Sequence, residues 1–194
     1  MTENLSASTI AYFGYGSLVN LGSLRTPYIS AHRVTLSGWQ RAWLARPRVE
    51  GSFATTDGLA FLSVVAAPGV DIDGLLITDH ASSLAALDER EALYSRVTIA
   101  AETLQHHDEP IEPEQQFLYV ADEPLACDDA QILRSYLDVV MQGYLQHFGE
   151  AGLERFMSTT LNFECSILED REEPLYPRAT TLSPAEEQLF ARFR

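Results

Sequence analysis

The segment SSLAALDEREALYSR, residues 82–96, contains a carboxylate placed for acid/base chemistry. At about 100° per residue, a helical wheel puts Glu91 inside the apolar stripe that Leu84 and Leu87 define. Burying an unpaired carboxylate costs free energy. Glu91 is therefore either a general acid/base with a raised pKa, able to take up and return a proton near neutral pH, or one half of a buried ion pair with Arg96 or another arginine.

A second candidate is the stretch YFGYGS, residues 12–17, which places Gly14 and Gly16 directly after an expected strand. Glycine weakens a strand interior, so such a pair marks a turn, a bulge or a close backbone approach to a ligand. Without side chains in the way, the backbone N–H groups there can hold a substrate carboxylate or a developing oxyanion. Together with one mobile proton on a carboxyl, this is sufficient for acyl transfer between amines.

Other catalytic motifs are incomplete in this sequence. The dinucleotide fingerprint G-x-G-x-x-G fails at Val19, and the nucleophile elbow G-x-S-x-G is absent around Ser17. Ser17 is interpreted first as a helix N-cap and anion-binding hydroxyl, with a Ser17-dependent hydrolase as the weaker alternative. The five histidines form no H-x-x-x-H or H-E-x-x-H pair, and the chain has no lysine for a Schiff base or a Walker A loop. We therefore expect neither a metal nor a cofactor.

The composition limits the class of partner and the location. The chain of 194 residues carries 13 basic and 28 acidic residues, a net charge of −15, which would repel nucleic acid and anionic membranes. No apolar run reaches the roughly 20 residues that span a bilayer, and the first residues do not resemble a secretory signal. Cys127 and Cys165 lie far apart and outside any C-x-x-C pattern, so both are expected to be reduced. These features predict a cytoplasmic protein that binds neither nucleic acid nor membrane.

The order of the expected elements indicates an α+β fold. Strands are expected at residues 10–13, 34–36, 39–44, 59–66, 70–78, 96–104 and 116–120. The second strand region is kinked at Gly38, and the turn signal AAPG separates the next two strands. Helical periodicity covers residues 82–94 and 128–148, and Ser183 with Pro184 begins a last helix. This order differs from the βαβ alternation of a doubly wound sheet.

The loop and the helix together resemble the γ-glutamylcyclotransferase superfamily, which includes ChaC-type glutathione-degrading enzymes and γ-glutamylamine cyclotransferases. In that family a Y-G-S loop follows the first strand, and the last Glu of an L-D-x-x-E helix is the catalytic base; YFGYGSL and LDEREALYSRV are similar to these motifs. SGWQRAWLAR, residues 37–46, and VDIDGLLI, residues 70–77, resemble the family's second strand and the strand that leads into the catalytic helix. Tyr136, seven residues before Gly143, matches a tyrosine in a late helix of the family.

The resemblance implies a small mixed β-barrel with packed helices. It also implies cofactor-free conversion of a γ-glutamyl amide to 5-oxoproline and a free amine, with Glu91 as the catalytic residue. The substrate would be a γ-glutamyl amino acid, a peptide such as glutathione, or a γ-glutamyl amine. The substrate-binding residues that the resemblance implies are Tyr12, Phe13, Gly14, Tyr15, Gly16, Ser17 and Tyr136. Leu18, where many members have asparagine, favours the ChaC-type branch.

We expect one domain over residues 1–194, with a core at about 10–145 and a C-terminal helical extension at 146–194. The extension has no counterpart in the family motifs, and we expect it to shape the leaving-group side of the site. The alternative to an enzyme is a catalytically silent module of the same fold that binds a small metabolite or serves as a scaffold. In that module Glu91 would be a ligand contact or part of a core ion pair.

Overall fold

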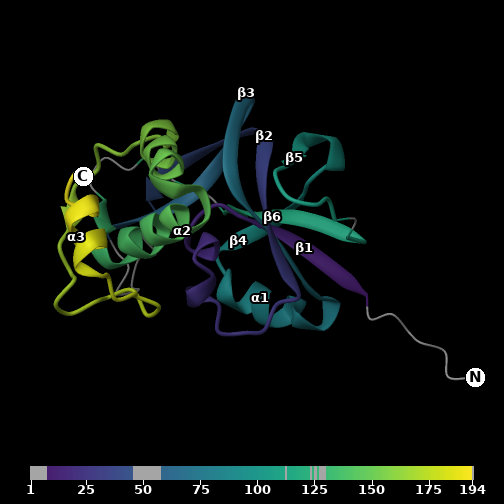
Figure 1. Ribbon diagram of the computed structural model, residues 1–194, viewed down its shortest axis with the longest axis horizontal. Helices are drawn as coiled ribbons and strands as arrows, with labels where there is room; N and C mark the ends of the chain where they lie inside the picture. The colour runs from purple at the N-terminus through teal and green to yellow at the C-terminus, as the bar shows by residue number, and fades with distance from the viewer. Residues whose placement is uncertain are drawn as a thin grey trace, which may run out of the picture.

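The computed structural model describes residues 8–45, 58–111, 113–122, 124, 126 and 130–193. Its centre is one mixed eight-stranded sheet. Helices α2 and α3 lie together beside the sheet, at the left in Figure 1, whereas α1 lies separately below it. The predicted α+β fold is confirmed.

The regular elements have the following bounds. The strands are β1 (Thr9–Gly14), β2 (Ser30–Ala45), β3 (Leu59–His80), β4 (Tyr94–Thr98), β5 (Leu104–His106), β6 (Gln115–Ala121), β7 (Gln131–Leu133) and β8 (Ile167–Leu168). The α-helices are α1 (Leu84–Arg90), α2 (Arg134–Thr159) and α3 (Pro184–Phe190). Short 3-10 helices are η1 (Ser17–Val19), η2 (Leu21–Ser23), η3 (Ala81–Ser83) and η4 (Ala101–Thr103).

The sheet is open and not a closed barrel. It runs in the order β4-β6-β1-β3-β2-β5, and β7 and β8 extend it beside β3. The edge strands β4 and β5 are consecutive in the chain but do not pair with each other, because residues 99–103 leave the sheet and include η4. The predicted closure into a barrel is therefore wrong, and so is the prediction of one strand over 96–104.

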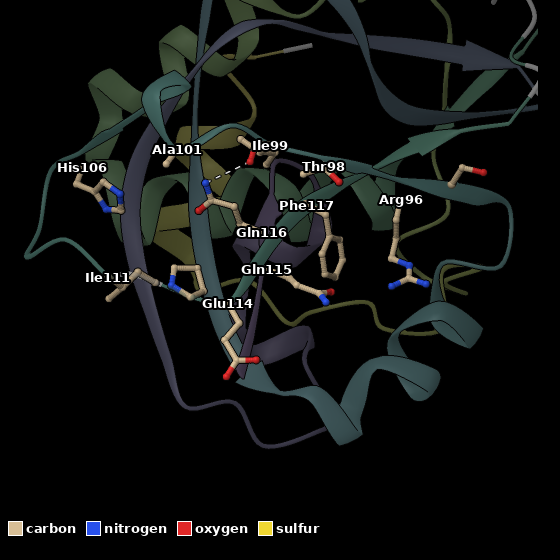
Figure 2. Close-up of a pocket in the computed structure, with 12 residues that line it drawn as sticks. Arg96, Thr98, Ile99, Ala101, His106, Ile111, Glu114, Gln115, Gln116 and Phe117 are labelled. Carbon is tan, nitrogen blue, oxygen red and sulfur yellow. Dashed lines mark hydrogen bonds between the residues drawn. The ribbon is translucent and has the colours of Figure 1, made fainter. Parts of the chain in front are cut away.

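A hollow of about 830 Å³ occupies this opening between β4, β6 and β5. Figure 2 shows its side chains, with the Gln116 amide donating a hydrogen bond of 3.2 Å to the carbonyl oxygen of Ile99. Elsewhere in the lining, on β5, Nδ1 of His106 is buried and has no hydrogen-bond partner among the described residues. None of the residues predicted to form the functional site lines this hollow.

Strand β1 is the element that carries the glycine loop into the interior. It lies antiparallel to β3 and parallel to β6, and every residue after Thr9 is buried. A strand that is covered on both faces is expected to have a near-continuous apolar sequence, as TIAYFG does. The prediction of a strand at residues 10–13 is confirmed.

Strands β2 and β3 form a long antiparallel ribbon. Gly38 (φ 88°) and Gly69 (φ 83°) adopt the left-handed region where the register shifts in the middle of this ribbon. Side chains disfavour that conformation, which explains glycine at both positions. The predicted kink at Gly38 is confirmed, but AAPG does not reverse the chain, and the two strands predicted on either side of it are one strand.

Helix α1 is shorter than the helix predicted over 82–94. It ends at Arg90, and residues 91–93 form a turn before β4 begins at Tyr94, which pairs with Ala121 of β6. Glu91 is the C-cap residue, with φ −102° and ψ 31°. The helical wheel therefore does not apply to Glu91 or beyond it, because pairing of β4 with the sheet replaces further helix.

Helix α2 is kinked at Gly149, where φ is 66°. The helix predicted over 128–148 begins only at Arg134, because residues 131–133 form β7, and it ends at this kink; a second helical segment continues to Thr159. The expected boundary between core and extension, at 145/146, falls inside α2. Between α2 and α3 the chain contains the strand β8, so this part of the extension is not helical. Helix α3 begins as predicted, with a capping box from Ser183 and Pro184 in its first turn.

The two cysteines differ in what the structure records. Cys165 is disulfide-bonded, so the expectation that this cysteine is reduced is wrong. Cys127 lies outside the described residues. None of the helices in the described ranges combines the length and the hydropathy that crossing a bilayer requires.

Candidate functional site

A pocket of about 540 Å³ brings together the loop after β1, the end of α1, the first turn of α2 and the segment 174–178. Its lining residues are Ser17, Leu59, Ala60, Phe61, Arg90, Glu91, Tyr94, Leu133, Tyr136, Pro174, Leu175, Tyr176, Pro177 and Arg178. A narrow adjoining cavity of about 30 Å³ shares several of these residues and is lined also by Phe13, Tyr15 and Gly16 of the loop. Six of the eight predicted site residues therefore meet at one place.

The other two predicted residues, Tyr12 and Gly14, line neither cavity. Tyr12 is buried in the core beside Phe117, with ring centroids 6.4 Å apart. A Cβ atom on Gly14 would lie 2.8 Å from Cβ of Leu18, closer than real side chains approach. Gly14 thus has a packing reason to be glycine, since the loop folds back over it.

Hydrogen bonds with α2 fix the loop after β1. The Asn20 amide donates hydrogen bonds of 3.0 Å to the carbonyl oxygen of Val139 and to Oε1 of Gln142. The Tyr144 hydroxyl donates to the carbonyl oxygen of Tyr15 at 2.9 Å. Buried polar contacts of this kind specify one conformation, because breaking them leaves unsatisfied groups.

Tyr136 on α2 stands directly over the loop. A Cβ atom on Gly16 would lie 3.0 Å from its hydroxyl oxygen. Seven residues on, a Cβ atom on Gly143 would lie 2.6 Å from the backbone nitrogen of Asn20. The spacing of Tyr136 and Gly143 puts both on one helix face, so the glycine lets α2 approach the loop and the tyrosine covers it.

Glu91 forms an ion pair with its neighbour in the chain. Arg90 Nε donates to Oε1 of Glu91 at 3.1 Å, and the two side chains are 10% and 16% exposed. Arg90 also donates to the carbonyl oxygen and to Oγ of Ser23, both at 3.3 Å, and lies 3.5 Å from Oγ of Ser17. Arg90 therefore links the carboxylate to the loop, whereas Arg96 pairs with Asp88 instead.

Tyr15 and Tyr136, which line the narrow cavity, are neutral hydroxyl groups. Burial raises the pKa of Tyr15 and of Tyr136 well above the usual value, and the nearby Glu91 charge raises both further. The Tyr15 hydroxyl donates to the carbonyl oxygen of Tyr119 at 2.7 Å, and the Tyr94 hydroxyl donates to that of Leu62 at 3.0 Å. Because a hydroxyl has one hydrogen, Tyr15 and Tyr94 can only accept a hydrogen bond from a substrate while these contacts last. With their raised pKa, Tyr15 and Tyr136 are not bases near neutral pH. Within the described ranges, no group of three or more His, Cys, Asp and Glu side chains is arranged to hold a metal ion.

Two arginines of the pocket, Arg90 and Arg178, were not singled out from the sequence. A helical wheel turns Arg90 about 100° away from Glu91, and the two side chains meet because the helix ends between them. Arg178 belongs to the segment PLYPR, residues 174–178, which has no helical or strand periodicity. The proline pair was the one local signal, since proline restricts an irregular segment to a few conformations.

Solved structures match this fold, although the sequence matches no protein-family model and no curated protein. A γ-glutamyl cyclotransferase superposes with a TM-score of 0.60 at 14% identity, over 95% of this chain and 99% of that chain. An uncharacterized human protein matches with a TM-score of 0.57 at 17% identity, over 95% and 99% of the two chains. YkqA from Bacillus subtilis gives 0.58 at 14% identity, over 76% of this chain and 52% of its own.

These matches show that the chain has the γ-glutamylcyclotransferase-like fold, as the resemblance of its motifs predicts. The match to the γ-glutamyl cyclotransferase covers 95% of this chain, so it extends well past residue 145. The C-terminal extension, which has no counterpart in the family motifs, is therefore at least partly included in the match of the fold. That extension contributes the segment 174–178 to the pocket.

Proposed function

We propose that this chain is a γ-glutamylcyclotransferase-type enzyme that converts a γ-glutamyl amide to 5-oxoproline and a free amine. One observation carries the proposal: the Glu91 carboxylate and the loop residues Gly16 and Ser17 line the same narrow cavity. The wider pocket that adjoins it offers room for the rest of the substrate. A carboxylate beside a rigid loop meets the requirements of proton transfer and of charge stabilisation at one carbonyl group.

In the proposed reaction the α-amine of the substrate attacks its own γ-carbonyl carbon. The new C–N bond closes the pyrrolidone ring, and the bond from that carbon to the leaving nitrogen breaks. Glu91 takes a proton from the attacking amine and passes a proton to the leaving nitrogen, so the carboxylate returns to its starting state. Arg90 holds the carboxylate beside the loop during these transfers.

We assign to Tyr136 the role of stabilising the negative charge that develops on the γ-carbonyl oxygen. Its hydroxyl stands over Gly16 of the loop, where it can donate its hydrogen to the substrate. A donor that is fixed before the reaction stabilises an oxyanion without reorganisation. The raised pKa of Tyr136 keeps the hydroxyl protonated for this role.

The ion pair of Arg90 and Glu91 supports a second candidate, a catalytically silent binding or scaffold module. In that case the carboxylate contributes only to stability. The third candidate, a Ser17-dependent hydrolase, has no such support: Oγ of Ser17 lies 3.5 Å from an arginine nitrogen, and no histidine lines the described part of the pocket.

Turnover of γ-glutamyl substrates tests the proposal. The wild-type chain is incubated with glutathione, a γ-glutamyl amino acid and a γ-glutamyl amine, and 5-oxoproline is measured. Glu91→Gln should lower turnover by about 10²–10⁴-fold, because it removes the proton-transferring group. Glu89→Gln is the matched control, since Glu89 is an exposed carboxylate one residue before Arg90.

Two results would contradict the proposal. Absence of 5-oxoproline from all three substrates with the wild-type chain would exclude cyclotransferase activity on these classes and favour the silent module. Unchanged turnover in Glu91→Gln, accompanied by a lower melting temperature, would show that Glu91 is structural.

A further inference from the structure

Arg178 has a buried donor that the described protein does not satisfy. Its side chain lines the pocket, and its Nε atom is buried without a hydrogen-bond partner among the described residues. A buried donor without a partner destabilises the folded state, so a folded protein rarely retains one without a reason. A ligand that accepts this hydrogen bond would be such a reason.

The other arginines within the described ranges all have protein partners. Seven form ion pairs with carboxylates: Arg33, Arg90, Arg96, Arg134, Arg155, Arg171 and Arg192. Arg25 donates to the carbonyl oxygen of Pro177, and Arg41 donates to that of Asp73. In a chain with 28 acidic residues, Arg178 is thus the described arginine whose guanidinium faces a pocket without a carboxylate beside it.

The segment that carries Arg178 is fixed in place. Arg25 donates a hydrogen bond of 2.8 Å to the carbonyl oxygen of Pro177, directly before Arg178. The Tyr176 ring packs edge-on against Tyr136, with centroids 4.9 Å apart, and its backbone N–H donates to Oγ of Ser135 at 3.3 Å. Arg178 is therefore a preorganised group, and binding an anion there requires little ordering of the chain.

The position of Arg178 relative to Glu91 indicates which part of a substrate it meets. Glu91 lines both the narrow cavity and the wide pocket, whereas Arg178 lines the wide pocket alone. If the reacting amide lies at Glu91, Arg178 faces the portion beyond the amide nitrogen. The charged side chains of the pocket are two arginines and one glutamate, so the lining has an excess positive charge that suits an anionic leaving group.

We infer that Arg178 binds a carboxylate on the leaving group, so that the preferred substrates are γ-glutamyl amino acids and peptides and not γ-glutamyl amines. This inference rests on the proposed function. Arginine is suited to the role because its planar fork can donate two parallel hydrogen bonds to one carboxylate. It also gives the C-terminal extension a role in substrate selection.

A matched substrate pair tests the inference. γ-Glutamylalanine and γ-glutamylethylamide differ only by the carboxylate on the leaving group. We expect the wild-type kcat/KM to favour γ-glutamylalanine, and Arg178→Gln to lower kcat/KM for that substrate by about 10- to 100-fold, the value of a charge-assisted hydrogen bond. The same variant should change kcat/KM for γ-glutamylethylamide by no more than about twofold. Arg192→Gln is the charge-matched control, because Arg192 is exposed and lies outside this pocket.

The outcomes separate this inference from the proposed function. If both substrates yield 5-oxoproline but Arg178→Gln affects them equally or not at all, the inference is overturned and the enzyme remains. If neither yields 5-oxoproline, calorimetric binding of the same two compounds to the Glu91→Gln variant decides. Tighter binding of γ-glutamylalanine that is lost in Glu91→Gln/Arg178→Gln supports the Arg178 site without the activity, and equal or absent binding overturns it.

Discussion

The ion pair of Arg90 and Glu91 can be measured directly with a double-mutant cycle. Arg90→Gln removes the contact with Glu91 and two hydrogen bonds to Ser23. Because the arginine side chain is only 10% exposed, we expect a loss of about 2–3 kcal/mol in the free energy of unfolding. For a chain of this size that loss lowers the melting temperature by about 4–12 °C.

The coupling energy isolates the ion pair from the other contacts. Unfolding in urea is followed for the wild type, Arg90→Gln, Glu91→Gln and the double variant. We expect a coupling of about 1–2 kcal/mol, above the range of exposed ion pairs and below that of fully buried ones, because the side chains are 10% and 16% exposed. The hydrogen bonds to Ser23 affect both limbs of the cycle equally and cancel.

A second pair on the same segment supplies the control. Arg96 and Asp88 lie 3.2 Å apart but are 42% and 41% exposed. The same cycle on this pair should give less than about 0.5 kcal/mol, because solvent screens the interaction. Equal coupling in both pairs, or additivity at Arg90 and Glu91, would refute the argument that burial makes the first pair strong.

Two further predictions concern the loop and the pH dependence of stability. Gly16→Ala should lower kcat/KM with little change in melting temperature, because its Cβ would lie 3.0 Å from the Tyr136 hydroxyl; Gly14→Ala should instead lower the melting temperature, because its Cβ would lie 2.8 Å from Cβ of Leu18. The reverse pattern would contradict the packing assignment. The guanidinium of Arg33, which forms an ion pair with Asp108, lowers the pKa of Asp108 from 3.8 to about 2. The contribution of the ionised Asp108 carboxylate to stability should therefore be complete above about pH 4 and disappear as the pH falls through 2. The difference in melting temperature between the wild type and Asp108→Asn should vanish over this range. A difference that stays constant with pH would contradict the ion pair.

Local signals in the sequence were sufficient for some elements. The apolar run before Gly14 predicted β1 because a strand covered on both faces needs no polar alternation. Ser183 and Pro184 predicted α3 because caps act within one turn of helix. The meeting of the loop with Glu91 followed from the resemblance of two motifs, and the structure places both at one cavity.

Other features depend on contacts that local patterns do not contain. Alternating apolar residues over 96–104 fit one strand, but the pattern does not say that two different strands of the sheet receive its two ends. Helix α1 ends where it does because Tyr94 pairs with β6. As a result, Glu91 is the C-cap residue and does not lie on a helical face. Arg178 meets the pocket through the anchoring of its segment to α2 and Arg25, which no periodicity predicts. Cytoplasmic location and the absence of nucleic-acid and membrane partners stay predictions.

The contacts of the loop constrain how a substrate oxygen can bind there. The Tyr136 hydroxyl stands over the loop, where a Cβ atom on Gly16 would lie 3.0 Å from it, so a substrate oxygen must either displace that hydroxyl or accept a hydrogen bond from it. Displacement would move a ring that packs edge-on against Trp43 at 5.8 Å and against Tyr176 at 4.9 Å. Aromatic pairs of this geometry are worth about 0.5–1.5 kcal/mol each beyond the area they bury. Acceptance of a hydrogen bond from Tyr136 keeps both ring contacts, which is why the proposed mechanism has this tyrosine stabilise the oxyanion.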